Sequence, residues 1–203
     1  MKEQIILISG GTSFRNLEHA LDFYKKVDIE DEKKYKSWKD WLVWSLEEKY
    51  DFIIPKMPTK DNAQYQIWKL MFEKYLAKLN TENTTIIAHS LGTIFILKYL
   101  VENGFSKKIK QLHLVSPIVS NDFQPADDVE DCGTFTFDIA KVNMLKNLCE
   151  VIHIWHSKDD EACEYANAEY LVKEIPTSIF HSFETRGHFS QQTFPELFDI
   201  LRK

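Results

Sequence analysis

Ser90 lies in the segment Ala88-His89-Ser90-Leu91-Gly92, which separates one apolar stretch from another. A serine between a strand and a helix, with small residues two positions before and after it, is typical of a nucleophile elbow. Such a turn exposes the hydroxyl and directs the N-terminus of the helix at the site. The pattern predicts that Ser90 is a nucleophile and that the backbone N–H of Leu91 binds a developing oxyanion.

A serine hydroxyl becomes nucleophilic when a base accepts its proton and an acid orients that base. Around a nucleophile elbow, the acid and then the base follow later strands of the chain. The pair Asp159-Asp160 follows the next-to-last apolar run, and His188 follows the last one. Because parallel strands end at one edge of a sheet, we expect Ser90, one of these aspartates and His188 to meet there.

The oxyanion site needs a second donor, which in this type of site comes from the turn after the first strand. Gly10-Gly11-Thr12 occupies that position, and the backbone N–H of Gly11 or of Thr12 is the expected donor. The residues do not decide between the two. A dinucleotide-binding turn is the competing interpretation, but Phe14 and Arg15 break the glycine pattern that such a turn requires.

The elements that must position these residues are visible as short apolar runs. Most of them are apolar at consecutive positions, as expected for parallel strands covered on both faces. Helical spacing separates the runs, most clearly from Tyr65 to Leu79 and in a second stripe from Tyr35 to Tyr50. Strands that alternate with helices predict a mostly parallel sheet with helices on both faces. The six runs are residues 5–8, 52–54, 85–88, 112–115, 151–155 and 179–181.

Composition sets limits on the class of protein. The chain has 203 residues, of which 44% are hydrophobic and 28% charged, so it can bury a core and is expected to form one domain over residues 1–203. Its net charge of −6 argues against a nucleic-acid or anionic-membrane surface, and no apolar run reaches the roughly 18 residues of a membrane span. Three cysteines without metal spacing fit a reducing, cytoplasmic compartment.

The motifs together resemble the small, lidless α/β-hydrolases, a serine hydrolase family that includes relatives of retinoblastoma-binding protein nine and their bacterial counterparts. The resemblance extends over nearly the whole chain. It implies a three-layer α/β fold with a six-stranded, mainly parallel sheet in the order 2-1-3-4-5-6 and no separate lid domain. It rests on the turn Ser9-Gly10-Gly11-Thr12, on Lys56-Met57-Pro58, on the elbow, on the paired aspartates after Ser157-Lys158, and on Gly187-His188-Phe189.

The resemblance also implies a role for each residue of the site. The nucleophile falls on Ser90, the base on His188 and the acid on Asp160, which leaves Asp159 as a turn or capping residue. The chain departs from the family pattern at the acid, where Ala162-Cys163 stands in place of the usual hydrophobic residue and proline. The first glycine of the elbow is replaced by alanine, and the glycine turn after the first strand is shortened.

We therefore expect a serine hydrolase that cleaves a small, uncharged carboxylic ester, thioester or amide through an acyl-enzyme intermediate. This chemistry needs no metal and no organic cofactor. The alternative is a protein-interaction module that keeps the hydrolase fold with a vestigial or secondary site, and a protein partner would then replace the small-molecule substrate. The acidic stretch 117–134 follows a strand, so we expect it at the mouth of the site, where it would disfavour anionic substrates.

Overall fold

The computed structural model describes residues 2–27, 37–80, 83–123 and 131–203. Its centre is a six-stranded sheet in the order β2-β1-β3-β4-β5-β6, in which each neighbouring pair is parallel. This arrangement confirms the fold class and the strand order expected above. The strands are β1 (Glu3–Ile8), β2 (Tyr50–Ile53), β3 (Asn83–His89), β4 (Lys108–Val115), β5 (Cys149–Ser157) and β6 (Ile179–Phe183).

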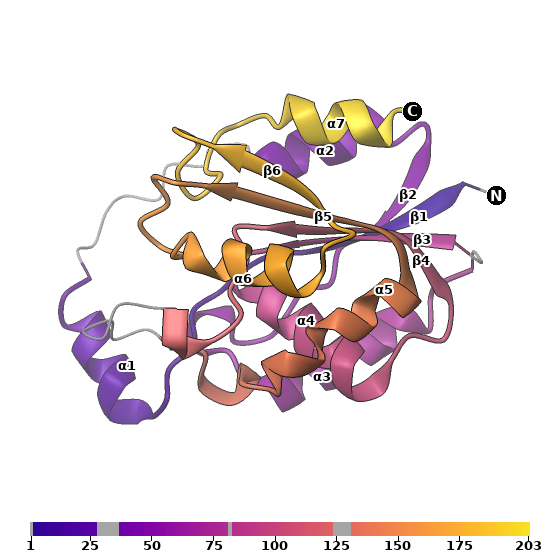
Figure 1. Ribbon diagram of the computed structural model, residues 1–203. Helices are drawn as coiled ribbons and strands as arrows, with labels where there is room; N and C mark the ends of the chain where they lie inside the picture. The colour runs from indigo at the N-terminus through magenta and orange to yellow at the C-terminus, as the bar shows by residue number, and fades with distance from the viewer. Residues whose placement is uncertain (1, 28–36, 81–82, 124–130) are drawn as a thin grey trace.

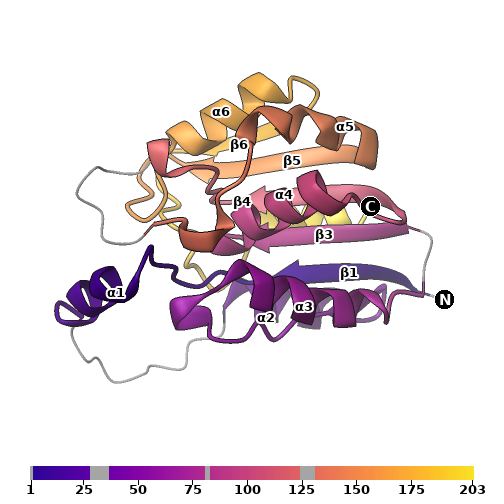
Figure 2. The ribbon, with the colours of Figure 1, turned by 90° about the horizontal axis from the view of Figure 1, so that it is seen from below.

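Helices cover both faces of the sheet (Figure 1). Helices α2 and α7 lie on one face and α3, α4, α5 and α6 on the other, whereas α1 projects beyond the carboxyl edge of the strands (Figures 1 and 2). The helices are α1 (Leu17–Tyr24), α2 (Trp38–Leu46), α3 (Tyr65–Leu76), α4 (Leu91–Asn103), α5 (Leu145–Leu148), α6 (Ala166–Glu174) and α7 (Pro195–Leu201). In the described ranges, no helix combines the length and the apolarity needed to cross a bilayer.

The second helical stripe ends earlier than its spacing suggested, and Tyr35, its expected first residue, lies outside the described residues. Helix α2 begins at Trp38, after a capping box between Ser37 and Asp40, and ends at Leu46. Tyr50, the expected end of the stripe, instead opens β2 and pairs with Glu3 of β1. A buried tyrosine fits the helical spacing and also the first position of a half-buried strand, so the periodicity alone did not separate the two.

The apolar strands divide their side chains between two cores. In β1, Ile5 and Leu7 pack in the core beneath α2 and α7, whereas Ile6 and Ile8 pack in the core beneath α3 and α4. All four are at most 1% exposed. A strand buried on both faces gains from apolar residues at every position, which explains why the runs do not alternate with polar residues.

Candidate active site

Ser90 occupies the turn between β3 and α4. Its backbone has φ 55° and ψ −130°, a conformation that is strained for a residue with a side chain. Its N–H donates to the carbonyl of Val115, which ties the turn to β4. Gly92 allows α4 to start close to β1, since a Cβ there would lie 2.9 Å from the carbonyl oxygens of Ile8 and Ser9. The sequence expectation of a tight turn with a small residue after the serine is consistent with this geometry.

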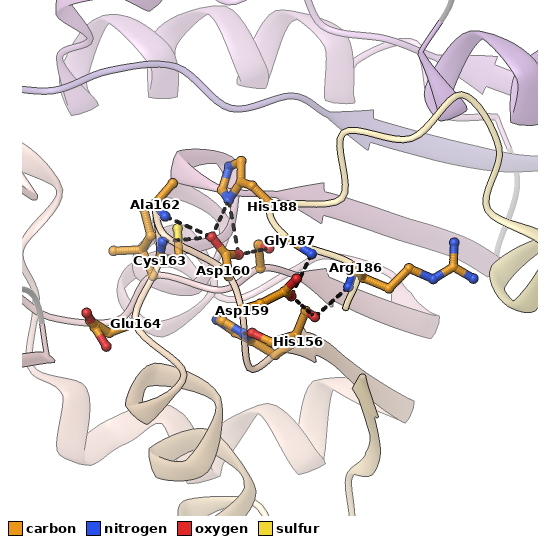
Figure 3. A network of polar contacts seen from close by, with 12 residues as sticks. His156, Asp159, Asp160, Ala162, Cys163, Glu164, Arg186, Gly187 and His188 are labelled. Carbon is orange, nitrogen blue, oxygen red and sulfur yellow. Dashed lines mark hydrogen bonds and ion pairs between the residues drawn. The ribbon is translucent and has the colours of Figure 1, made fainter. Parts of the chain in front are cut away.

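His188 and Asp160 lie in hydrogen-bond contact. The Nδ1 atom of His188 is 3.1 Å from both carboxylate oxygens of Asp160, although the two residues come from different loops, after β6 and β5 (Figure 3). The Asp160 side chain is fully buried and that of His188 is 25% exposed. A carboxylate that accepts the Nδ1 proton fixes the imidazole tautomer and leaves Nε2 able to accept another proton.

Several further donors hold the Asp160 carboxylate. The Ser116 hydroxyl donates to it at 2.5 Å, and the backbone N–H groups of Ala162 and Cys163 each donate at 3.0 Å. Burial opposes ionisation of the carboxyl group, but the hydrogen bonds from His188, Ser116 and Cys163 outweigh it and lower the pKa of Asp160 to about 2. Asp160 is therefore a carboxylate at neutral pH in a pre-organised set of donors.

Ser116 was not found by sequence reasoning. It follows β4 directly, at the same sheet edge as Ser90, and also has a positive φ of 45°. Its N–H donates to the carbonyl of Trp155, and its side chain is buried. The sequence feature that could have indicated Ser116 is its position immediately after a strand, because a serine at that position lies beside the loop that carries Asp160.

Asp159 points away from His188. The Asp159 carboxylate accepts hydrogen bonds from the Ser157 hydroxyl at 2.5 Å and from the Gly187 N–H at 2.8 Å (Figure 3). The bond from Ser157, followed by the bond from Gly187, lowers the pKa of Asp159. The same Ser157 hydroxyl accepts from the Arg186 N–H. Asp159 thus connects the loop after β5 to the loop that carries His188.

The backbone donors near Ser90 differ in what they contact. The expected second oxyanion donor was the N–H of Gly11 or of Thr12. Of these two, the Thr12 N–H donates to the carbonyl of Lys60 at 2.7 Å and is therefore engaged within the protein. Within the described ranges, the N–H groups of Gly11 and Leu91 make no such contact. Gly11 lies close to the same carbonyl, where a Cβ would be 2.4 Å from the Lys60 oxygen.

A buried histidine supports the loop of His188 from the other side. The Nε2 atom of His89 lies 3.0 Å from the His188 carbonyl oxygen, and its Nδ1 lies 3.2 Å from the Lys39 amine. Donation to a carbonyl requires a proton on Nε2, so Nδ1 accepts from Lys39. Burial, followed by the charge of Lys39, lowers the pKa of His89 well below its ordinary value, and burial lowers that of Lys39 to about 8. These contacts join α2 and the elbow to the His188 loop.

A cavity of about 420 Å³ opens over these residues. Gly11, Thr12, Ser90, Leu91 and His188 line it together, whereas Asp160 lies behind His188. The structure therefore brings the side chains of the expected nucleophile and base to one cavity and places the expected acid against the base.

Part of the acidic stretch also reaches this cavity. Asp131 lines the cavity, and its carboxylate is paired with Arg15 at 3.0 Å. Glu161, from the loop after β5, is a second acidic residue of the lining. The residues Asp127, Asp128 and Glu130 lie outside the described part of the chain.

Comparisons with known proteins agree with this geometry. The model of a family described as serine hydrolase matches residues 31–199, which is most of the chain and includes the elbow and both later loops. The chain belongs to the serine hydrolase family. The match begins after β1, so the glycine turn at Gly11 lies outside it.

Three known proteins are similar to this chain over most of its length. The rat protein "Serine hydrolase RBBP9" is 25% identical over 167 residues, which cover 81% of this chain and 84% of the rat protein. The crystal structure of the ydeN gene product of Bacillus subtilis has a TM-score of 0.72 at 22% identity and covers 99% of this chain and 97% of that one. Est1E of Butyrivibrio proteoclasticus, solved with ferulic acid bound, has a TM-score of 0.63 at 14% identity and covers 98% and 86%.

Proposed function

We propose that the protein cleaves a small, uncharged carboxylic ester, or a thioester or amide, with Ser90 as nucleophile, His188 as base and Asp160 as the acid that orients it. The observation that carries the proposal is the contact of His188 Nδ1 with both oxygens of the buried Asp160 carboxylate, beside a serine at a strained strand-to-helix turn. Family membership supports the same class of chemistry.

In the proposed reaction, the Ser90 oxygen attacks the carbonyl carbon while His188 Nε2 accepts the hydroxyl proton. The carboxylate of Asp160 stabilises the imidazolium that forms. The N–H groups of Leu91 and Gly11 donate to the oxyanion of the tetrahedral intermediate. His188 then gives the proton to the leaving alcohol, thiol or amine, and a water molecule activated by the same imidazole hydrolyses the acyl-enzyme.

The cavity wall supports an uncharged substrate. Glu161 is exposed and lines the cavity, whereas the Asp131 side chain is only 6% exposed and its carboxylate is paired with Arg15, so Glu161 supplies the exposed negative charge at the wall. An anionic substrate would be repelled at this short range. A volume of about 420 Å³ suits a small molecule rather than a long chain.

Labelling with a fluorophosphonate probe tests the proposal, because the probe reacts with an activated serine. Wild-type protein should be labelled and should hydrolyse short-chain p-nitrophenyl esters. The variant Ser90→Ala should do neither. Ser13→Ala is the matched control, because Ser13 lines the same cavity and has no role in the proposed reaction, so this variant should be labelled. An unlabelled wild-type protein, or a labelled Ser90→Ala variant, would refute the proposal, and the first result would favour the protein-interaction module.

A further inference from the structure

Three metal-binding side chains meet at the proposed acid and base. A carboxylate oxygen of Asp160, the sulfur of Cys163 and a ring nitrogen of His188 all lie within 4.8 Å of one another. Figure 3 shows the Cys163 sulfur on the side of its loop that faces the other two side chains.

A thiolate, an imidazole and a carboxylate are ligands that Zn²⁺ accepts in tetrahedral sites. Bonds of about 2.0–2.3 Å to zinc place neighbouring donor atoms roughly 3.3–3.8 Å apart. The His188 and Asp160 ligand atoms are 3.1 Å apart and no two of the three atoms are more than 4.8 Å apart, so binding requires side-chain movements of up to about 1 Å. Asp160 and Cys163 are buried, and both Cys163 and His188 line the cavity, which gives an ion a route from solvent.

We propose that Asp160, Cys163 and His188 form an inhibitory binding site for a thiophilic divalent cation, and that Zn²⁺ is the ion that binds there. The Cys163 thiol gives its proton to solvent as the metal–sulfur bond forms, and a water molecule from the cavity fills the fourth position. Unlike a cofactor, this ion opposes the reaction.

The inhibitory part of the proposal rests on the proposed function. A metal on His188 Nε2 removes the acceptor for the Ser90 proton. A metal on Nδ1 takes the lone pair of that nitrogen, so the single proton of the neutral ring moves to Nε2, which can then no longer accept the Ser90 proton. Either position stops His188 from acting as the base. The binding part concerns only the three ligands, and it can be measured without turnover.

Cys132 provides a matched control for the thiol. It is also buried and also lines the cavity, but it does not belong to the three-ligand group. Burial raises the pKa of the Cys132 thiol to about 12, which disfavours the thiolate there. A general reaction of cavity thiols with metal would affect both cysteines, whereas the proposed site needs Cys163 alone.

The experiment has a spectroscopic and a kinetic part. CdCl₂ titrated into metal-free protein should produce the ultraviolet charge-transfer band of a cadmium thiolate in wild type and in Cys132→Ser, but not in Cys163→Ser or Cys163→Val. ZnCl₂ should slow fluorophosphonate labelling of wild type and Cys132→Ser, and EDTA should reverse this. The Cys163 variants, each compared with its own metal-free rate, should need at least about tenfold more Zn²⁺.

Two Cys163 variants are used because serine is polar and valine is apolar, so a fold that rejects one can accept the other; circular dichroism verifies folding of each. A band and a zinc sensitivity that persist in both folded Cys163 variants would overturn the proposal, as would a band lost in Cys132→Ser alone. If metal-free wild type is not labelled, the proposed function fails, and the cadmium band still decides whether the metal site exists.

Discussion

Replacement of Asp160 by asparagine tests the assignment of the acid most directly. One carboxylate oxygen accepts from the backbone N–H groups of Ala162 and Cys163, and the other accepts from the Ser116 hydroxyl. In Asp160→Asn, the amide oxygen can keep the two backbone bonds, which places the NH₂ group opposite His188. An NH₂ group donates to Nδ1, so the imidazole proton moves to Nε2 and the ring can no longer accept the Ser90 proton.

Both catalysis and stability should change by amounts that the structure allows us to estimate. Loss of the correct tautomer should lower the rate of ester hydrolysis about 10³–10⁴-fold. The pKa of Asp160 is about 2, against an ordinary value of 3.8, so its ionised form contributes about 2 kcal/mol to the free energy of unfolding. This contribution is present above pH 3.8 and is lost as the pH falls through about 2, so the variant should be less stable than wild type at pH 7.

Asp159→Asn is the matched control, since it changes the same residue type at the neighbouring position. The amide oxygen of asparagine can still accept from Ser157 and Gly187, so the rate should fall less than about tenfold. The assay combines p-nitrophenyl ester hydrolysis, the rate of fluorophosphonate labelling, and urea unfolding at pH 7. Equal rate losses in the two variants, or a larger loss in Asp159→Asn, would show that the acid is assigned wrongly.

Two further predictions concern the elbow and the buried histidines. In Gly10→Ala the new Cβ would lie 2.8 Å from the Ser90 Cβ and 3.2 Å from the Ser90 hydroxyl oxygen. Fluorophosphonate labelling should therefore slow about 10²-fold in a protein that still melts cooperatively. An unchanged rate of labelling would contradict this close contact. Burial, followed by the neighbouring His181, lowers the pKa of His153 to about 4, so the native ring is neutral while the unfolded ring takes a proton below pH 6.5. His153 should therefore contribute up to about 1.4 kcal/mol per pH unit to the fall in the free energy of unfolding as the pH is lowered from 6.5 to 4. Urea titrations should show a slope that is smaller by this amount in His153→Gln, and an equal slope in both proteins would refute this assignment.

Local patterns were sufficient for much of the fold. Strand-length apolar runs and helical spacing are properties of neighbouring residues, and burial on both faces of a parallel sheet leaves a clear pattern in them. The elbow around Ser90 was visible for the same reason, because its turn, its small residues and its flanking elements are contiguous. The positions of His188 and of the aspartate pair followed from strand order, since parallel strands end at one edge.

The contacts between loops could not be read from the chain. Asp159 and Asp160 are adjacent and chemically identical, and only the packing of the loops after β5 and β6 directs Asp160 to His188 and Asp159 to Gly187. The engagement of the Thr12 N–H depends in the same way on Lys60, which is distant in sequence.

Ser116 and Cys163 show the same limit. Ser116 belongs to no local pattern that marks it, and Cys163 was visible only as part of the pair Ala162-Cys163. In the structure, Ser116 donates to the Asp160 carboxylate and the Cys163 thiol lies close to it. Local spacing and chain order were sufficient to predict the strands, the turn that carries Ser90 and the sheet edge at which the candidate site lies. Which donors face which acceptors is visible only in the folded chain, because hydrogen bonds depend on the direction of side chains in segments that are far apart in the sequence.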